Sequence, residues 1–112
     1  VALKKMQLLA PDLSRELIDD VLEKAGVDKA DVTFFASHQP TLWFLPVCQE
    51  HVGLKHAKTQ PTFATTGTIS NVNVPAQLAA AAQNGKLRRG DVVVVLTIAG
   101  GMTATAAVMR WV

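Results

Sequence analysis

The chain has 112 residues, enough for one domain with a single hydrophobic core and too few for two. Hydrophobic residues make up 49% of the sequence and charged residues 18%, a balance that indicates a well-buried globular domain. The net charge of +2 is small, and no basic stripe is interleaved with aromatic residues, so the composition argues against a nucleic-acid partner.

Residues 11–25 are predicted to form an amphipathic helix. Pro11 suits the first turn of this helix, and Gly26 suits the position just past its end. The charged residues within 19–24 take the opposite face and are interpreted as a solvent-exposed surface. The apolar residues recur at three- and four-residue steps and therefore share one face: Leu13, Leu17, Ile18, Val21, Leu22 and Ala25.

A buried strand and a second helix come after this helix. Residues 32–36 are a short apolar run of strand-forming residues, which predicts a buried strand. The second helix is expected to begin at Pro40 and to run to about His51, with Gly53 as its stop. Because Pro46 lies inside this range and has no backbone N–H, it predicts either a kink or a later start of the helix.

A second strand and an Ala-rich helix come next. Residues 63–66 are predicted to form the strand. The stretch "TTGTISNVNVP" reads as a loop that leads into a third helix over about 74–83, with Asn71 or Asn73 as its cap. Small alanine side chains would let this helix lie close against a sheet, and the Asn-Gly pair at 84–85 ends it.

The stretch "DVVVVLTIAGGMTATAAVMRWV" closes the chain. Two strand-forming runs flank Gly100 and Gly101, which predicts a hairpin. Residues 92–98 are apolar almost throughout, as expected of a central strand that is covered on both faces. The order helix, strand, helix, strand, helix, strand, strand predicts an α/β layered domain with a partly parallel sheet and a final antiparallel hairpin.

Three stretches that come directly after predicted strands are candidates for a functional site. His38 comes after the first strand, "GTIS" at 67–70 after the second, and Gly100 after the third. Because the carboxyl ends of parallel strands meet at one edge of a sheet, we expect these residues to lie together. Each stretch also has a purely structural interpretation: a turn histidine, a helix-capping loop and a tight hairpin turn. The functional interpretation is a histidine near a glycine N–H that faces an oxyanion.

The remaining reactive residues are weaker candidates. Cys48 lies in the middle of a predicted helix and is expected to pack as a small apolar side chain. His51 and His56 are five residues apart and do not share a helix face, so we expect no metal site. With no nucleophile recognised, a histidine and an oxyanion hole would be half a catalytic site.

The single cysteine and the lengths of the apolar runs indicate the cellular compartment of the protein. One cysteine excludes an internal disulfide and favours a reducing compartment, so we expect a cytoplasmic protein. No apolar run approaches the ~18 residues that a membrane-spanning helix needs, so we expect no membrane partner.

Two stretches of the sequence, at 37–44 and at 65–111, resemble a known family. "SHQPTLWF", residues 37–44, resembles the His-Gln-Ala-Asn element of the β-ketoacyl-acyl-carrier-protein synthase III family, a branch of the thiolase-like superfamily. The stretch from "TTGTISNVNVP" to "MRW" resembles the C-terminal elements of that family: a Gly-Asn-Thr-Ser loop, a Val-Pro helix, a basic loop, a Val-rich strand, a glycine-rich turn and a last strand. The resemblance implies half of a thiolase-like fold, with a mixed, mostly parallel sheet, helices packed on it and a C-terminal antiparallel hairpin. It also implies that residues 1–112 are the C-terminal domain of a longer synthase whose absent N-terminal half carries the nucleophilic cysteine.

The resemblance further implies a ping-pong reaction. The cysteine takes an acyl group from acyl-CoA and then condenses it with malonyl-acyl-carrier protein as carbon dioxide leaves, as in fatty acid or polyketide biosynthesis. It implies no bound cofactor, because coenzyme A and phosphopantetheine act as substrate carriers, and a homodimer for the full-length protein. This fragment alone is expected to be inactive. The basic loop at 86–89 is interpreted first as cations at a helix end and second as a docking point for the acidic carrier protein.

Four positions carry over from the family. His38 matches the catalytic histidine, Gly100 falls where the family supplies a backbone N–H to the acyl thioester oxygen, and Thr41 lies where the family has an asparagine near the pantetheine arm. Thr68 replaces the second catalytic residue, an asparagine whose amide offers two donors and reaches further than a hydroxyl. The alternatives are therefore a non-decarboxylating acyltransferase of the same fold and a catalytically silent partner subunit. Thr68 counts against condensation, His38 counts against a silent subunit, and neither argues against acyl transfer.

Overall fold

The computed structural model describes residues 2–38, 43–62, 73–99 and 103–112, and the side chains of 2–11, 73, 98, 99 and 103 are not among the described features. Within these residues the chain forms α-helices, a short 3-10 helix and β-strands. In sequence they are α1 (Ala2–Ala25), η1 (Lys29–Asp31), β1 (Phe34–Ser37), α2 (Phe44–His51), α4 (Asn73–Gln83), β2 (Val92–Ala99) and β3 (Thr103–Arg110). None of the described helices is long and apolar enough to cross a membrane.

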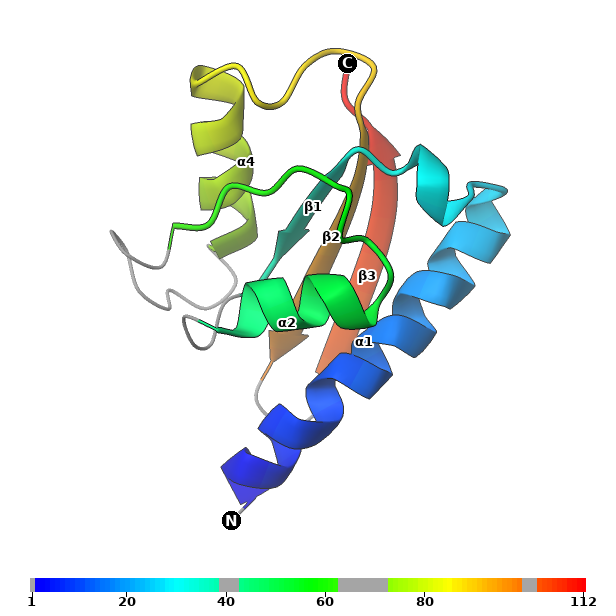
Figure 1. The fold of residues 1–112 in the computed structure, drawn as a ribbon, viewed down its shortest axis with the longest axis vertical. Helices are drawn as coiled ribbons and strands as arrows, with labels where there is room; N and C mark the ends of the chain where they lie inside the picture. Colours follow the sequence, from blue (N-terminus) through cyan, green and yellow to red (C-terminus); the bar gives the residue numbers. More distant parts are fainter. Residues whose placement is uncertain (1, 39–42, 63–72, 100–102) are drawn as a thin grey trace.

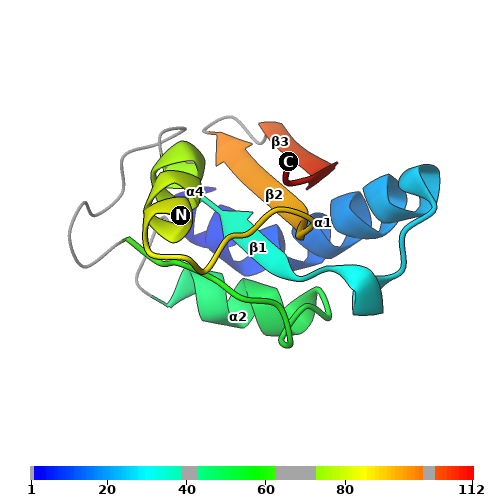
Figure 2. The ribbon, with the colours of Figure 1, turned by 90° about the horizontal axis from the view of Figure 1, so that it is seen from above.

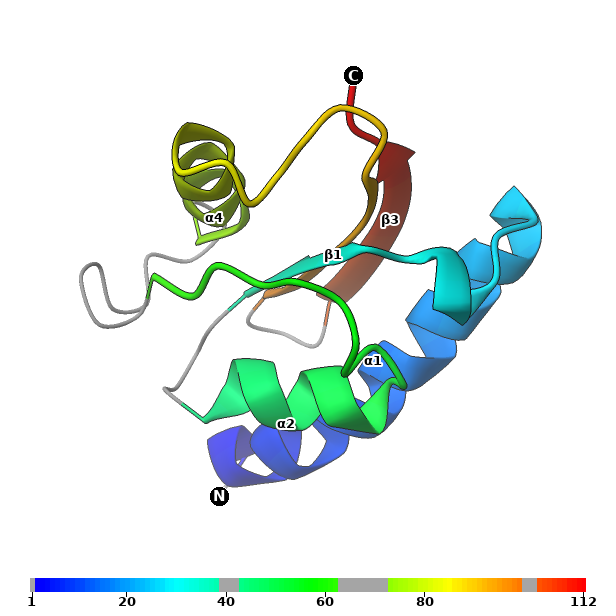
Figure 3. The same cartoon turned by 45° about the horizontal axis from the view of Figure 1, so that its top comes forward.

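The strands form one sheet in the order β1-β2-β3 (Figure 1). β1 runs parallel to β2, and β3 runs antiparallel to β2. Helices α1 and α2 lie on one face of the sheet and α4 lies on the other, as Figures 2 and 3 show. The predicted α/β class, with a mixed sheet, packed helices and a closing antiparallel hairpin, is confirmed.

The two faces of the sheet hold separate hydrophobic cores, because alternate residues of a strand point to opposite faces. The cluster beneath α1 and α2 is the larger of the two. Its buried members are Ile18, Leu22, Val32, Phe35, Phe44, Leu45, Cys48, Val52, Leu54, Ala57, Val94 and Leu96. The cluster beneath α4 is built from Phe34, Ala36, Val74, Ala81, Leu87 and Val93. Burial on both faces makes β2 the central strand that its apolar run predicted.

Helix α1 is longer than predicted. It begins at Ala2, nine residues before Pro11, so the expected start is wrong. Residues 2–10 are rich in strong helix formers (Leu, Lys, Met, Gln, Ala), and their combined propensity outweighs the one backbone donor that proline lacks. The end is as predicted: Gly26 takes a φ of 68°, and two backbone bonds, Gly26 to Glu23 and Val27 to Leu22, close a Schellman motif.

The first strand and the second helix both begin later than expected. β1 covers Phe34–Ser37 rather than 32–36, because the backbone N–H of Val32 is used to cap η1 at Lys29. α2 begins at Phe44. Pro46 predicted either a kink or a later start of the helix, and the later start is confirmed. As the third residue of α2, Pro46 lies where a backbone N–H has no partner within the helix. The expected start at Pro40 lies outside the described residues.

The C-terminal half agrees closely with the prediction where it is described. Helix α4 covers Asn73–Gln83 against an expected 74–83, and the Val-rich run forms β2. The predicted strand at 63–66, the cap at Asn71 and the Gly100–Gly101 turn lie outside the described residues.

A polar network ties together the amino ends of β1 and β2. The Asp91 carboxylate accepts hydrogen bonds from the Thr33 hydroxyl (2.9 Å), the Arg88 backbone N–H (2.8 Å) and the Lys58 ammonium (3.2 Å). Its side chain is only 13% exposed. Burial opposes the charged form of Asp91, but the hydrogen bonds from Arg88, Thr33 and Lys58 and the charge of Lys58 together outweigh it and lower the pKa of this carboxyl.

We expect Asp91→Ala to destabilise the protein by about 2 kcal/mol near neutral pH, because three bonds to one carboxylate are lost. The pKa of Asp91 is lower in the folded state than its usual value of 3.8, so its contribution is fully present above that value. The contribution is lost as the pH falls through the lower folded-state value. Urea unfolding across this pH range measures the difference, with Asp20→Ala, an exposed carboxylate in an i,i+4 pair, as the control. Equal stability of Asp91→Ala and the wild type near neutral pH would contradict the network's role.

Candidate active site

His38 lies directly after β1, at the carboxyl end of the strand. Its backbone N–H donates to the carbonyl of Leu96 in β2 at 2.9 Å. Its own carbonyl accepts from the Ser37 hydroxyl at 3.1 Å. The residue is partly exposed, whereas Phe34, Phe35, Ala36 and Ser37 before it are all buried. The strand therefore ends by presenting a histidine at the rim of the sheet.

The carboxyl end of β2 lies at the same rim. Ser37 pairs with Leu96 in the parallel register, and β2 continues from there to Ala99, the residue before Gly100. The prediction that these two strand ends share one edge is confirmed. Gly100, Thr41 and Thr68 themselves lie outside the described residues, so the meeting of the histidine with a glycine amide stays a prediction.

Gln77 on α4 makes a contact that the sequence did not reveal. Its side-chain Oε1 accepts from the backbone N–H of Ser37 at 3.1 Å, and its Nε2 donates to the carbonyl of Ser37 at 2.8 Å. Both residues are 0% exposed. The available signal is a polar residue between apolar neighbours in "VPAQLAAAA", but helical spacing alone does not say which backbone group such a side chain meets.

Cys48 is buried in the core beneath α1 and α2, as predicted. Burial raises the pKa of its thiol to about 11, and a hydrogen bond with Ser14 offsets only part of that rise. A thiol with this pKa stays protonated at neutral pH and is a poor nucleophile. As Cys48 is the single cysteine of the sequence, these 112 residues supply no cysteine suited to attack a thioester.

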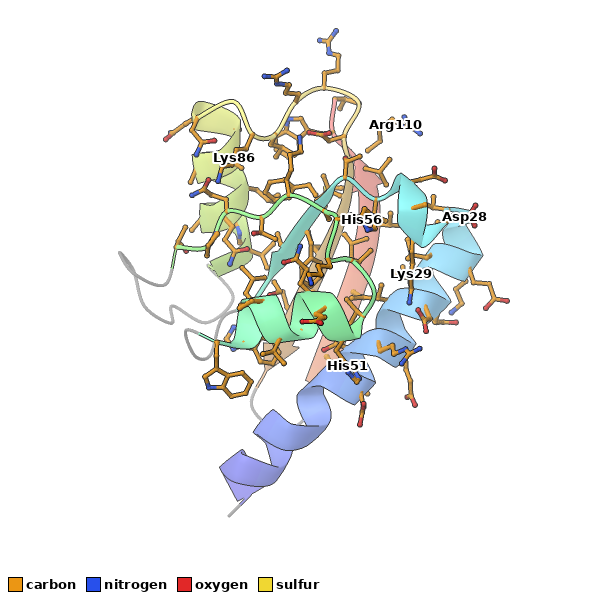
Figure 4. The ribbon with its side chains drawn as sticks, in the orientation of Figure 1. Asp28, Lys29, His51, His56, Lys86 and Arg110 are labelled. Atoms are coloured by element: carbon orange, nitrogen blue, oxygen red, sulfur yellow. The ribbon has the colours of Figure 1, made fainter. Side chains whose placement is uncertain are left out.

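The other two histidines face different segments of the chain (Figure 4). His51 Nε2 lies 2.6 Å from a carboxylate oxygen of Asp12 on α1, and His56 Nε2 lies 2.9 Å from the Lys29 carbonyl. In the described parts of the chain, no three His, Cys, Asp or Glu side chains gather as a metal site would require.

The basic loop at 86–89 connects α4 to the amino end of β2. Figure 4 shows Lys86 at the end of the sheet from which β2 starts, and β1 and β2 run away from it. His38 lies beside β2 at Leu96 and Thr97, and the six steps from Asp91 to Thr97 span about 20 Å at about 3.3 Å per residue. The basic loop and His38 therefore lie at opposite ends of β2. Arg88 donates from Nε to the Gly85 carbonyl at 3.1 Å, which fits the local interpretation of these cations.

A histidine at the carboxyl edge of parallel strands, helices on both faces and a closing antiparallel strand pair match the thiolase-like α/β domain that the resemblance implied. The solved structure of 3-oxoacyl-[acyl-carrier-protein] synthase III from Aquifex aeolicus VF5 matches this fold with a TM-score of 0.89. The match covers 96% of this chain and 35% of that one, at 27% sequence identity. The sequence model of the family described as 3-oxoacyl-[acyl-carrier-protein (ACP)] synthase III C terminal matches residues 22–111. The chain belongs to this family.

Curated relatives agree with this assignment. The β-ketoacyl-[acyl-carrier-protein] synthase III of Bacillus pumilus is 35% identical over 92 residues, which are 82% of this chain and 30% of the relative. The β-ketoacyl-[acyl-carrier-protein] synthase III 1 of Bacillus cereus is 32% identical over 91 residues, which are 81% of this chain and 29% of the relative. The chain thus spans less than a third of the length of these relatives.

Proposed function

We propose that this chain is the C-terminal domain of a longer synthase III-type enzyme, which condenses an acyl group from acyl-CoA with malonyl-acyl-carrier protein. The observation that carries this proposal is His38, held at the carboxyl end of β1 against β2 in a chain of this family. The buried, protonated Cys48 supports a nucleophile outside these residues. The greater length of the relatives leaves room for an N-terminal half that supplies it.

In this proposal each carried-over residue has one task. His38 donates a hydrogen bond to the malonyl thioester oxygen and stabilises the enolate that forms as carbon dioxide leaves. The backbone N–H of Gly100 binds the acyl thioester oxygen, and Thr41 contacts the pantetheine arm. The enzyme works in the cytoplasm as a homodimer, uses coenzyme A and phosphopantetheine only as carriers and needs no further cofactor.

Acyl transfer without decarboxylation is the second candidate, and Thr68 favours it. Thr68 occupies the position of the family's asparagine and has a single, shorter-reaching hydroxyl in place of two amide donors. Loss of one such donor typically costs about 3 kcal/mol of transition-state stabilisation. Transfer to another acceptor needs the cysteine, the histidine and the oxyanion hole, but not the enolate-stabilising amide.

Carbon dioxide release separates the two candidates. The full-length protein is mixed with acyl-CoA and malonyl-acyl-carrier protein labelled in the free carboxyl group, and both gas release and enzyme mass are monitored. We expect label release that depends on acyl-CoA, and release about 10²-fold faster in Thr68→Asn because a lost donor is restored. The partly exposed Thr59, in a loop, gives Thr59→Asn as the matched control. An acyl-enzyme that forms without label release in either protein would leave transfer as the function.

A further inference from the structure

Strand β1 has hydrogen-bonding groups on both of its edges near His38. The N–H of His38 points to β2, where it meets the Leu96 carbonyl. The N–H of Phe35 points the other way and donates to the carbonyl of Lys58, which forms an isolated parallel bridge beside the strand. Because successive residues of a strand alternate between edges, the N–H and carbonyl of Ser37 share the edge of Phe35.

The amide of Gln77 fills this edge at Ser37. A side-chain carboxamide carries the same donor and acceptor as a peptide group, so it pairs with one residue of a strand as a neighbouring strand would. The two bonds, 3.1 Å to the N–H and 2.8 Å to the carbonyl, also fix which end of the amide is oxygen. Ser37 and Gln77 are both 0% exposed, so water cannot simply replace the amide.

These bonds constrain the main chain on each side of the peptide that carries His38. Gln77 holds Ser37 from the outer edge, and the Leu96 carbonyl holds the His38 N–H from β2. The Ser37 hydroxyl holds the His38 carbonyl. The backbone is thus fixed from the Ser37 N–H to the His38 carbonyl, which leaves the imidazole little freedom beyond its own side-chain rotations.

Gln77 also joins two segments of the proposed site. It lies one turn into α4, which begins at Asn73, and Thr68 precedes that helix in the sequence. Its partner, Ser37, lies 40 residues earlier in the chain and directly precedes His38. A shift of α4 relative to β1 would therefore break the Gln77 bonds and free the end of the strand that carries His38.

We propose that Gln77 is a positioning residue for His38: its amide holds the end of β1 so that the imidazole meets the carrier-bound thioester. This inference rests on the proposed function, because it assumes that His38 acts in the second half-reaction. In this proposal Gln77 acts through its two hydrogen bonds to the backbone of Ser37.

The test compares Gln77→Met with Gln49→Met in the full-length protein. Both substitutions replace a hydrogen-bonded amide with an apolar side chain of similar length. Gln49, on α2, donates to the carbonyls of Leu54 (3.0 Å) and Ala57 (2.8 Å), away from His38. We expect Gln77→Met to slow the second half-reaction at least about 10-fold and to change acylation by acyl-CoA less than about 2-fold, since small misplacements of a reacting group are costly. Gln49→Met should leave the ratio of the two half-reactions unchanged.

Gln77→Glu supplies a readout that a purely structural role would not produce. Burial raises the pKa of a carboxyl, and the protonated acid has one donor and one acceptor in the pattern of the amide. The ionised carboxylate instead has no donor for the Ser37 carbonyl. We expect the second half-reaction of Gln77→Glu, relative to the wild type, to recover as the pH falls from about 8 to about 6, whereas Gln77→Met shows no such recovery. This variant also decides the question if Gln77→Met does not fold.

The outcomes distinguish a failure of the positioning role of Gln77 from a failure of the proposed function. Equal slowing of both half-reactions in Gln77→Met, or no slowing of the second, overturns the positioning role. A Gln77→Glu variant that does not recover at lower pH also overturns it. If His38→Ala meanwhile loses the second half-reaction, the proposed function stands and only the role of Gln77 fails. If His38→Ala keeps that half-reaction, the assigned role of His38 fails, and the inference falls with it.

Discussion

The His38→Ala variant of the full-length protein is expected to take up an acyl group from acyl-CoA at close to the normal rate and then to stall. In the proposed mechanism, removal of the imidazole takes away a hydrogen bond to the enolate of the second half-reaction, an effect worth about 10²- to 10³-fold in rate. The first half-reaction of that mechanism relies on the cysteine and the oxyanion amide, which the substitution does not touch. Intact-protein mass measures acylation, and product formation from malonyl-acyl-carrier protein measures the second step.

His51→Ala is the matched control for this variant. His51 is exposed at the end of α2 and pairs with Asp12 on α1, so its loss should leave both half-reactions intact. An acylation defect in His38→Ala, with His51→Ala normal, would give His38 a different role, that of the base which activates the cysteine.

The isolated 112-residue chain is expected to show no turnover and no acylation. Its single cysteine is buried, and a pKa of about 11 leaves about one thiol in ten thousand ionised at neutral pH. Burial also blocks the approach of a thioester. Incubation with acyl-CoA, then intact mass and release of free coenzyme A, measures both steps, with the full-length protein as the positive control. Acyl transfer by the isolated chain would show that the nucleophile has been placed in the wrong half.

The sequence was most informative where local chemistry decides the structure. The apolar run at 92–98 and the Ala-rich stretch at 74–83 predict β2 and α4 to within one residue at each end, and β3 pairs antiparallel to β2 as predicted. Gly26 ends α1 as its position predicted, because glycine takes the left-handed conformation that closes this helix without strain. The prediction that His38 lies at the carboxyl edge of the sheet followed from the order of helices and strands along the chain. The parallel pairing of β1 with β2 confirms it.

The errors arose where neighbouring residues or distant contacts outweigh a local signal. Pro11 suggested a helix start, but the helix formers before it extend α1 to Ala2. Gln77 and Ser37 are 40 residues apart, and no periodicity links a helical amide to one backbone group of a strand. The Asp91 network is similar, since Thr33 and Asp91 meet across 58 residues only when β1 and β2 pair.

The roles of the site residues were assigned from the family resemblance. Of these residues, the structure describes only His38. His38 has a described backbone and a position at the strand end that suits its assigned role. Thr41, Thr68 and Gly100 remain predictions. All three lie outside the described residues.

The most direct test of the central claim is a crystal structure of the full-length protein with an acyl group trapped on its cysteine. We predict that the Gly100 N–H lies about 3 Å from the thioester oxygen, at hydrogen-bonding distance. The His38 imidazole should face the same acyl group from the end of β1. An imidazole turned away from the acyl group, or a Gly100 amide out of hydrogen-bond reach of the thioester, would contradict thioester chemistry at this edge of the sheet.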